Sequence, residues 1–210
     1  GVSLFVLLFC NLVFMLNRRH LRIRVLQALY AWKKNPARDL EKAKKEFLKS
    51  LQEVQKLYSF LLLYLVELRD YAANFIEESK SKKLPSQEDL NPNTKFINNL
   101  FINALKDDTT LLKLAGTFKL SYAGEQEMVK KIYFNLKQTE DYQEYMAVQG
   151  QDFESDKMFV SKIFRKFLIE EAYFQHFLEE KNIHWGDDLP FISSMVLKTI
   201  KDSKEGKIDL

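Results

Sequence analysis

Residues 17–32, with the sequence NRRHLRIRVLQALYAW, are the stretch that decides the fold class of this chain. Its apolar residues recur at steps of three and four, which is the spacing of one face of an α-helix: Leu21, Val25, Ala28, Leu29 and Trp32. Arginines border this stripe and flank it, so one side of the helix is free to pack while the other offers guanidinium groups to phosphates. The stretch therefore predicts an amphipathic, cationic helix.

The rest of the chain has the same helical character. The 210 residues include only six Gly and four Pro, and the apolar residues keep a helical rather than an alternating period. We therefore predict an all-α protein, a helical bundle with an extended set of amphipathic helices. The expected helices span residues 18–34, 37–82 (one long helix or two joined by a slight break), 95–106, 125–146, 154–181 and 191–201.

Boundaries between these helices follow from the few breakers. The first helix should stop before Asn35–Pro36, because the residue preceding a proline disfavours helical geometry. Residues 84–93 read as a polar loop, and no element is assigned to residues 107–124. Asp187 or Asp188 is expected to cap the last helix, with Pro190 in its first turn.

Charge is distributed unevenly along the chain. Residues 17–45 hold ten Lys and Arg against two acids, a local charge of +8, whereas the whole chain carries +3, so the remainder sums to −5. Such asymmetry indicates nucleic acid or an anionic membrane as a partner. The alternative is a solvated, lysine-rich helix face.

Residues 2–16, VSLFVLLFCNLVFML, form an apolar run that ends just before the arginines. The run is shorter than the ~20 residues that cross a bilayer, and it lacks the flanking features of a signal peptide. We therefore expect residues 1–16 to be an apolar N-terminal extension, of which residues 1–14 are not native and Met15 is the start. A membrane anchor and an apolar segment packed on the bundle are the alternatives. The single cysteine, Cys10, is consistent with a reducing compartment.

Motifs of known catalytic centres are missing from the sequence, which contains no G-x-S-x-G, P-loop, G-x-G-x-x-G or H-E-x-x-H pattern. Acidic pairs such as Glu77–Glu78 and Glu170–Glu171 diverge by about 100° on a helix, so they do not form a converging dyad. His176 lies one turn before two glutamates, a spacing typical of an ion pair rather than a metal site. We predict that the chain is not an enzyme and binds no metal or cofactor.

The run Arg18-Arg19-His20-Leu21-Arg22, followed by residues 26–32 (LQALYAW), closely resembles the opening of NusB-type transcription antitermination factors. Residues 84–85, 91–96, 153–157, 179–181, 185 and 187–189 resemble the long-chain bacterial variant of that family. The resemblance covers residues 15–210. The family's F-x-N-G-x-L segment is not recognisable after Val196, so we expect the NusB-like region, residues 17–210, to be truncated at its C-terminus.

This resemblance implies an all-helical, cytoplasmic, RNA-binding protein. The family binds boxA-type, single-stranded RNA of rRNA transcripts together with the ribosomal protein NusE, and it acts on the transcription elongation complex in antitermination. Two alternatives stay open: the N-terminal RNA-binding part of an rRNA methyltransferase, and a membrane-tethered helical scaffold protein.

Under the resemblance, Arg18, Arg19 and Arg22 fall on the RNA-contacting arginines of the family, where guanidinium groups clamp phosphate and stack on bases. Tyr30 offers a stacking face or belongs to the core, and Gln27 reads a base edge or makes a buried polar contact. Trp32 is expected to pack. His20, within the cluster, weakens the phosphate-binding field unless it is protonated. The predicted RNA-binding residues are Arg18, Arg19, Arg22, Arg24, Gln27, Tyr30, Lys33 and Lys34.

Overall fold

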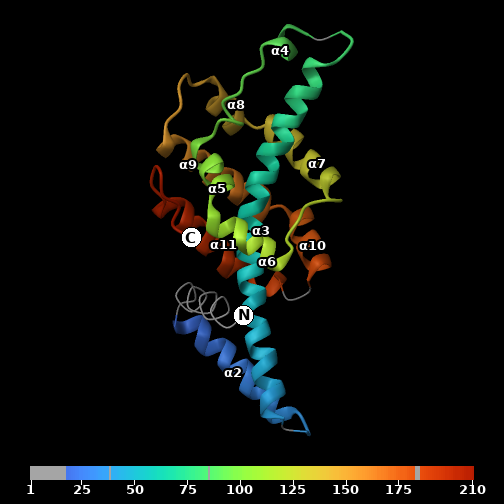
Figure 1. Cartoon of the computed structure of the whole chain (residues 1–210), viewed down its shortest axis with the longest axis vertical. Helices are drawn as coiled ribbons and strands as arrows, with labels where there is room; N and C mark the ends of the chain where they lie inside the picture. The colour runs from blue at the N-terminus through green and yellow to red at the C-terminus, as the bar shows by residue number, and fades with distance from the viewer. Residues whose placement is uncertain (1–17, 38, 85, 183–184) are drawn as a thin grey trace. The chain divides into compact units, whose positions relative to one another are not determined.

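A computed structural model describes residues 18–37, 39–84, 86–182 and 185–210. Over these ranges the chain is folded into helices joined by turns, with one isolated β-bridge between Lys204 and Lys207 (Figure 1). This confirms the predicted all-α class. The predicted apolar extension, residues 1–16, and Cys10 within it lie outside the described residues.

The chain divides into two compact units, residues 1–57 and residues 58–210. In unit 1 the structure describes α2 (Arg18–Lys34) and the first part of α3 (Leu40–Lys80). Unit 2 holds the rest of α3 and the shorter helices: α4 (Gln87–Leu90), α5 (Leu100–Asp107), α6 (Thr109–Phe118), α7 (Gln126–Lys137), α8 (Glu140–Ala147), α9 (Phe153–Phe164), a π-helical turn (Arg165–Ile169), α10 (Ala172–Lys181) and α11 (Trp185–Asp202).

Side-chain caps form the turn between α2 and α3. The Asn35 side chain accepts a hydrogen bond from the backbone N–H of Ala37 at 3.0 Å, and the Asp39 carboxylate accepts one from the N–H of Lys42 at 3.0 Å. The second contact satisfies a free N–H group at the start of α3. The first helix thus ends before Pro36 as predicted, and α3 is the single long helix of the two alternatives.

The predicted apolar stripe of α2 is only partly covered. No residue of α2 is buried, and Val25 and Leu29 are 44% and 51% exposed. Leu21, Ala28 and Trp32 are half-buried. Val25 and Leu29 thus lie on the surface although they share the predicted stripe with the half-buried residues. Within the described part of unit 1, one neighbouring helix faces α2, and a single neighbour covers a narrower strip than a bundle does.

The core of unit 2 is organised around α3. Leu61, Leu62 and Leu65 are fully buried. In Figure 1 the part of α3 that belongs to unit 2 runs between α7 and α10 on one side and α5 and α9 on the other. Aromatic rings fill the space beside it: Phe60 stacks on Tyr122 with centroids 4.3 Å apart. Burial of such rings supplies much of the hydrophobic stabilisation of a domain.

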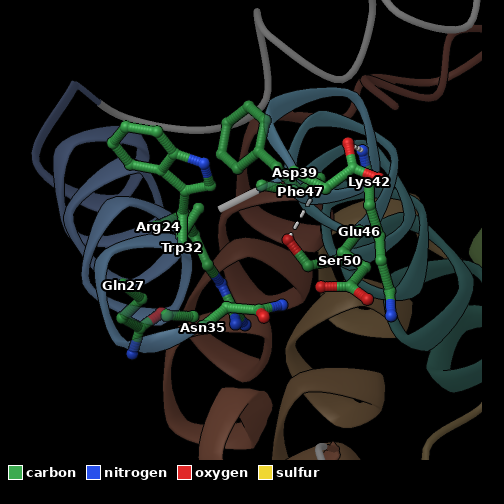
Figure 2. Close-up of a pocket in the computed structure, with 12 residues that line it drawn as sticks. Arg24, Gln27, Trp32, Asn35, Asp39, Lys42, Glu46, Phe47 and Ser50 are labelled. Atoms are coloured by element: carbon green, nitrogen blue, oxygen red, sulfur yellow. Dashed lines mark hydrogen bonds between the residues drawn. The ribbon is translucent and has the colours of Figure 1, made fainter. Parts of the chain in front are cut away.

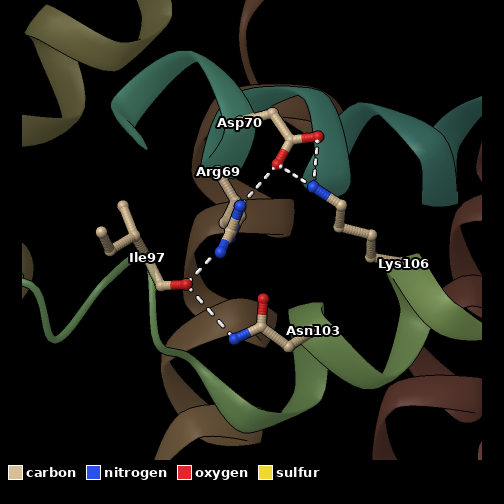
Figure 3. Close-up of polar contacts among 5 residues, drawn as sticks. All are labelled: Arg69, Asp70, Ile97, Asn103 and Lys106. Carbon is tan, nitrogen blue, oxygen red and sulfur yellow. Dashed lines mark hydrogen bonds and ion pairs between the residues drawn. The ribbon is translucent and has the colours of Figure 1, made fainter. Parts of the chain in front are cut away.

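Polar contacts attach α3 to α5 and to the segment before it (Figure 3). The Asp70 carboxylate accepts hydrogen bonds from the Lys106 ammonium at 2.8 and 3.0 Å and from the Arg69 guanidinium at 2.7 Å. Arg69 also donates to the carbonyl of Ile97 at 2.8 Å, and the Asn103 side chain donates to the same carbonyl at 3.2 Å. The backbone at Ile97 is thereby fixed against two helices.

Several predicted helix boundaries are wrong. The helix predicted from residue 95 begins at Leu100, because the Asn99 side chain caps it by accepting from the N–H of Ile102 at 3.0 Å. Residues 109–118, left unassigned, form α6, whose first N–H groups are capped by Asp108. The predicted loop at residues 84–93 contains the single turn of α4.

Two predicted helices are each divided in the structure. Residues 125–146 form α7 and α8, since the Thr139 hydroxyl accepts from the N–H of Tyr142 and starts a new helix. Residues 154–181 form α9, the π-helical turn and α10. The last helix begins at Trp185 rather than Phe191, so Pro190 lies inside it and the predicted cap residues Asp187 and Asp188 lie in its first turn.

Candidate nucleic-acid interface

The helix α2 is the most cationic element of the structure's described part. Its seventeen residues include six Lys and Arg and no Asp or Glu. Lys33 and Lys34 lie in the last turn, where cations interact favourably with the helix dipole. Most of the predicted RNA-binding residues are exposed: Arg18, Arg19, Arg22, Gln27, Tyr30, Lys33 and Lys34.

Tyr30 lies on the surface and not in the core. Its side chain is 64% exposed, and the Lys34 ammonium lies 5.6 Å from the centroid of its ring. The two predicted roles of Tyr30 were a stacking face and packing in the core, and this exposure excludes packing in the core. An aromatic face next to a cation is the combination that single-stranded nucleic acids use for stacking and for phosphate contact.

Arg24 differs from the other arginines because it is half-buried. Together with Gln27 it lines a pocket of about 170 Å³ between α2 and the start of α3 (Figure 2). Across this pocket α3 presents Lys42 and Glu46. Arg24 therefore belongs to a mixed-charge pocket, whereas Arg18, Arg19 and Arg22 lie on open surface.

Trp32 lines this polar pocket and also a second, mainly apolar pocket of about 300 Å³. The lining of this second pocket further includes Val25, Leu29, Leu40, Phe47 and the charged Glu41 and Lys44. Trp32 is half-buried, in keeping with the predicted packing role, but its indole Nε1 is buried without a hydrogen-bond partner among the described residues.

Sequence reasoning missed the contribution of the turn after α2 and of α3 to the polar pocket. Four residues outside the arginine motif line it: Asn35 and Asp39 from the turn, and Lys42 and Glu46 from α3. The short turn after α2 was the available signal, because a short connection folds the next helix back along the first. Asp39 and Glu46 add acidic groups beside the cations.

Charge separates between the two units. Residues 18–57 contain twelve Lys and Arg and four Asp and Glu, a charge of +8, and residues 58–210 sum to −5. A unit with such an excess of cations attracts polyanions over the range of the Debye length. The electrostatic conditions for nucleic-acid binding are thus concentrated in unit 1.

No family model, curated protein or solved structure matches this chain. Among the residues that the structure describes, no helix is both long enough and apolar enough to cross a membrane.

Proposed function

We propose that this chain binds single-stranded RNA through the exposed cationic face of α2 and acts as a transcription antitermination factor of the NusB type. One observation carries the proposal: exposed Arg18, Arg19 and Arg22 share a helix with exposed Tyr30, and that helix has no acidic residue.

Each group on this face suits a different part of a single strand. The three arginines present planar guanidinium groups that bind phosphate oxygens in pairs, and Lys33 and Lys34 act as point charges. Tyr30 offers its ring to an unstacked base. With a rise of about 1.5 Å per residue, α2 extends about 24 Å, long enough to follow several nucleotides.

The resemblance of residues 18–22 and 26–32 to NusB-type factors supplies the biological part of the proposal. Under it, the RNA is a boxA-type element of rRNA transcripts, and the ribosomal protein NusE and the transcription elongation complex are the partners. The protein then works in the cytoplasm and performs no catalysis of its own.

A second candidate is binding to an anionic membrane surface. The observation that favours it is the exposure of apolar side chains among the arginines, above all Leu26 at 68% and Leu29 at 51%. Helices that combine cations with exposed apolar residues lie in the lipid interface. RNA binding accounts better for Tyr30 beside Lys34, because the ring can stack on a base while the cation contacts a neighbouring phosphate.

The test compares two triple variants with equal loss of charge. Arg18→Ala, Arg19→Ala and Arg22→Ala remove the proposed phosphate contacts, and Lys113→Ala, Lys130→Ala and Arg165→Ala remove three exposed cations of unit 2. We expect the first set to weaken binding of a boxA-type RNA at least tenfold. It should also reduce the slope of log affinity against log salt concentration by roughly two. The second set should retain most of the affinity.

Fluorescence anisotropy of labelled RNA across a salt series measures both effects, with circular dichroism as the check on folding. Equal affinities of the two triple variants would exclude α2 as the RNA-binding face. A parallel experiment measures binding to vesicles that contain anionic lipid. If the chain binds these vesicles but does not bind RNA, the membrane candidate is favoured.

A further inference from the structure

A large cavity is lined by residues of unit 2 alone. Its volume is about 760 Å³, within the range of roughly 300–1,000 Å³ typical of small-molecule sites. Residues of α3, of the segment 91–97, of α7 and of α8 line it. The cavity therefore has walls from four elements of the chain, α3, the segment 91–97, α7 and α8.

Four aromatic residues are among those that line the cavity: Phe75, Phe96, Tyr133 and Tyr142. Phe75 is half-buried, whereas the other three rings are at most 7% exposed and back the cavity from the core. Phe96 meets Tyr142 edge-on with centroids 5.8 Å apart, and Phe75 lies 5.8 Å from Tyr133. Burial raises the pKa of the Tyr133 and Tyr142 hydroxyls further above physiological pH, where both groups are neutral. Such a wall favours a flat apolar ligand, because offset and edge-on ring contacts add to simple burial.

The described lining of the cavity carries positive charge and no negative charge. Among the described residues that line the cavity, Lys137 is the charged side chain, and none is a carboxylate. Its ammonium lies 5.4 Å from the ring centroid of Phe75 and 5.8 Å from that of Tyr133. Lys137 is exposed, so it stands at the rim with the aromatic wall beneath it. A negative group on a bound ligand would meet this cation where its apolar body meets the rings.

Hydrogen bonds hold the walls in place. The carbonyl of Ile97 accepts from Arg69 and Asn103, as Figure 3 shows. In the same segment, the Asn93 side chain donates to the carbonyl of Met146 at 2.8 Å and ties residues 91–97 to α8. Walls fixed before binding reduce the entropy that a ligand must overcome.

We propose that this cavity binds a small, planar aromatic molecule that carries one anionic group, with Lys137 as the partner of the anion. The cavity volume sets the size of the ligand, the four rings select a flat body, and the lone cation selects the charge. The site is independent of the RNA-binding proposal, because none of its lining residues lies in unit 1.

A pair of probes with the same shape and different charge tests this. The carboxylate 2-naphthoate and the neutral 2-naphthamide share one ring system, and their affinities are measured by titration calorimetry with the full chain. We expect the carboxylate to bind roughly threefold more tightly, since an ion pair with an exposed lysine is worth about 0.7 kcal/mol, which corresponds to that ratio.

Two variants locate the charge preference. Lys137→Gln should bring the affinity for the carboxylate down to that for the amide. Lys130→Gln, which replaces another exposed lysine of the same helix, should leave the threefold preference intact. Both positions are on the surface, so both variants are expected to fold. Methyl resonances of Ile76 and Ile97, which line the cavity, should shift on titration.

Three results would each overturn the inference: no binding of 2-naphthoate at millimolar concentration, a charge preference that survives Lys137→Gln, or methyl shifts at Val25 and Leu29 in place of Ile76 and Ile97. The last of these would assign the probe to the apolar pocket beside α2.

Discussion

The hydroxyl of Tyr145 donates a hydrogen bond of 2.6 Å to the carboxylate of Asp156, inside the core of unit 2. Asp156 is 0% exposed, and its second oxygen accepts from the backbone N–H of Leu100 at 2.7 Å and from the Gln151 side chain at 2.7 Å. One carboxylate thereby joins α9 to the start of α5 and to α8. A buried charge is tolerated when hydrogen bonds satisfy it in this way.

Replacing this carboxylate by an amide should destabilise the fold. We expect Asp156→Asn to lower the free energy of unfolding by about 2 kcal/mol and Tyr145→Phe by about 1 kcal/mol, because each leaves buried polar groups with fewer partners. Urea unfolding followed by circular dichroism measures both. Asp152→Asn is the matched control and should change little, since Asp152 is exposed and asparagine caps a helix as well as aspartate does. Equal losses at positions 152 and 156 would contradict this account of the network.

Lys157 is predicted to stabilise the end of α11. Its buried ammonium donates to the carbonyls of Lys201 at 3.0 Å and Ser203 at 2.7 Å. Lys157→Met keeps the length of the side chain but leaves both carbonyls without this donor, so we expect a loss of about 2 kcal/mol in urea unfolding. The exposed Lys162, which pairs with Asp141 at 2.7 Å, serves as the control, and Lys162→Met should have little effect. A stable Lys157→Met variant would show that water satisfies these carbonyls equally well.

Alkaline pH should destabilise the protein through Tyr58. Burial raises the pKa of its hydroxyl from 10.0 to about 12, while the hydroxyl hydrogen-bonds with that of Thr199 at 2.6 Å. Below pH 10 both the folded and the unfolded chain hold this proton, and the contribution is fully present. Between pH 10 and 12 the unfolded chain releases the proton first, so stability falls by up to about 3 kcal/mol. Urea unfolding across this range should show a smaller loss in Tyr58→Phe than in the native chain, and equal losses would refute the prediction.

A glycine at residue 119 should stabilise α6. Lys119 ends that helix with φ 52°, in the left-handed region that favours glycine. We expect Lys119→Gly to raise the free energy of unfolding by about 0.5 kcal/mol, because relief of the steric cost exceeds the added entropy of the unfolded chain. The same substitution at Lys113, inside α6, should lower stability by about 1 kcal/mol. Thermal unfolding of the two variants should therefore shift in opposite directions.

Tyr30 should contribute to RNA affinity by stacking and not by charge. Tyr30→Ala is expected to weaken binding of single-stranded RNA roughly tenfold, while the dependence of affinity on salt stays the same. The exposed Tyr173 of unit 2 provides the control, and Tyr173→Ala should bind as the native chain does. Anisotropy titrations at three salt concentrations separate the two effects, and a changed salt slope in Tyr30→Ala would argue against stacking.

Local sequence determined the elements whose ends depend on neighbouring residues. Asn35–Pro36 ends α2 because proline restricts the residue before it, and the uninterrupted apolar period after residue 40 produces one helix of 41 residues. The absence of acidic residues from α2 likewise followed from the sequence alone, and with it the candidate site. Such features need no knowledge of distant contacts.

Tertiary structure decided what depends on residues distant in sequence. The π-helical turn at residues 165–169 divides a segment with a continuous helical period, and this turn packs against α11, which lies further along the chain. The exposure of Val25 and Leu29 also depends on how much of α2 a neighbour covers. Asp156 and Lys157 read in the sequence as ordinary surface charges, and they are buried because their partners, Leu100 and Ser203, lie 56 and 46 residues away. Periodicity reports which residues share a face, but only the folded chain supplies the groups that meet that face.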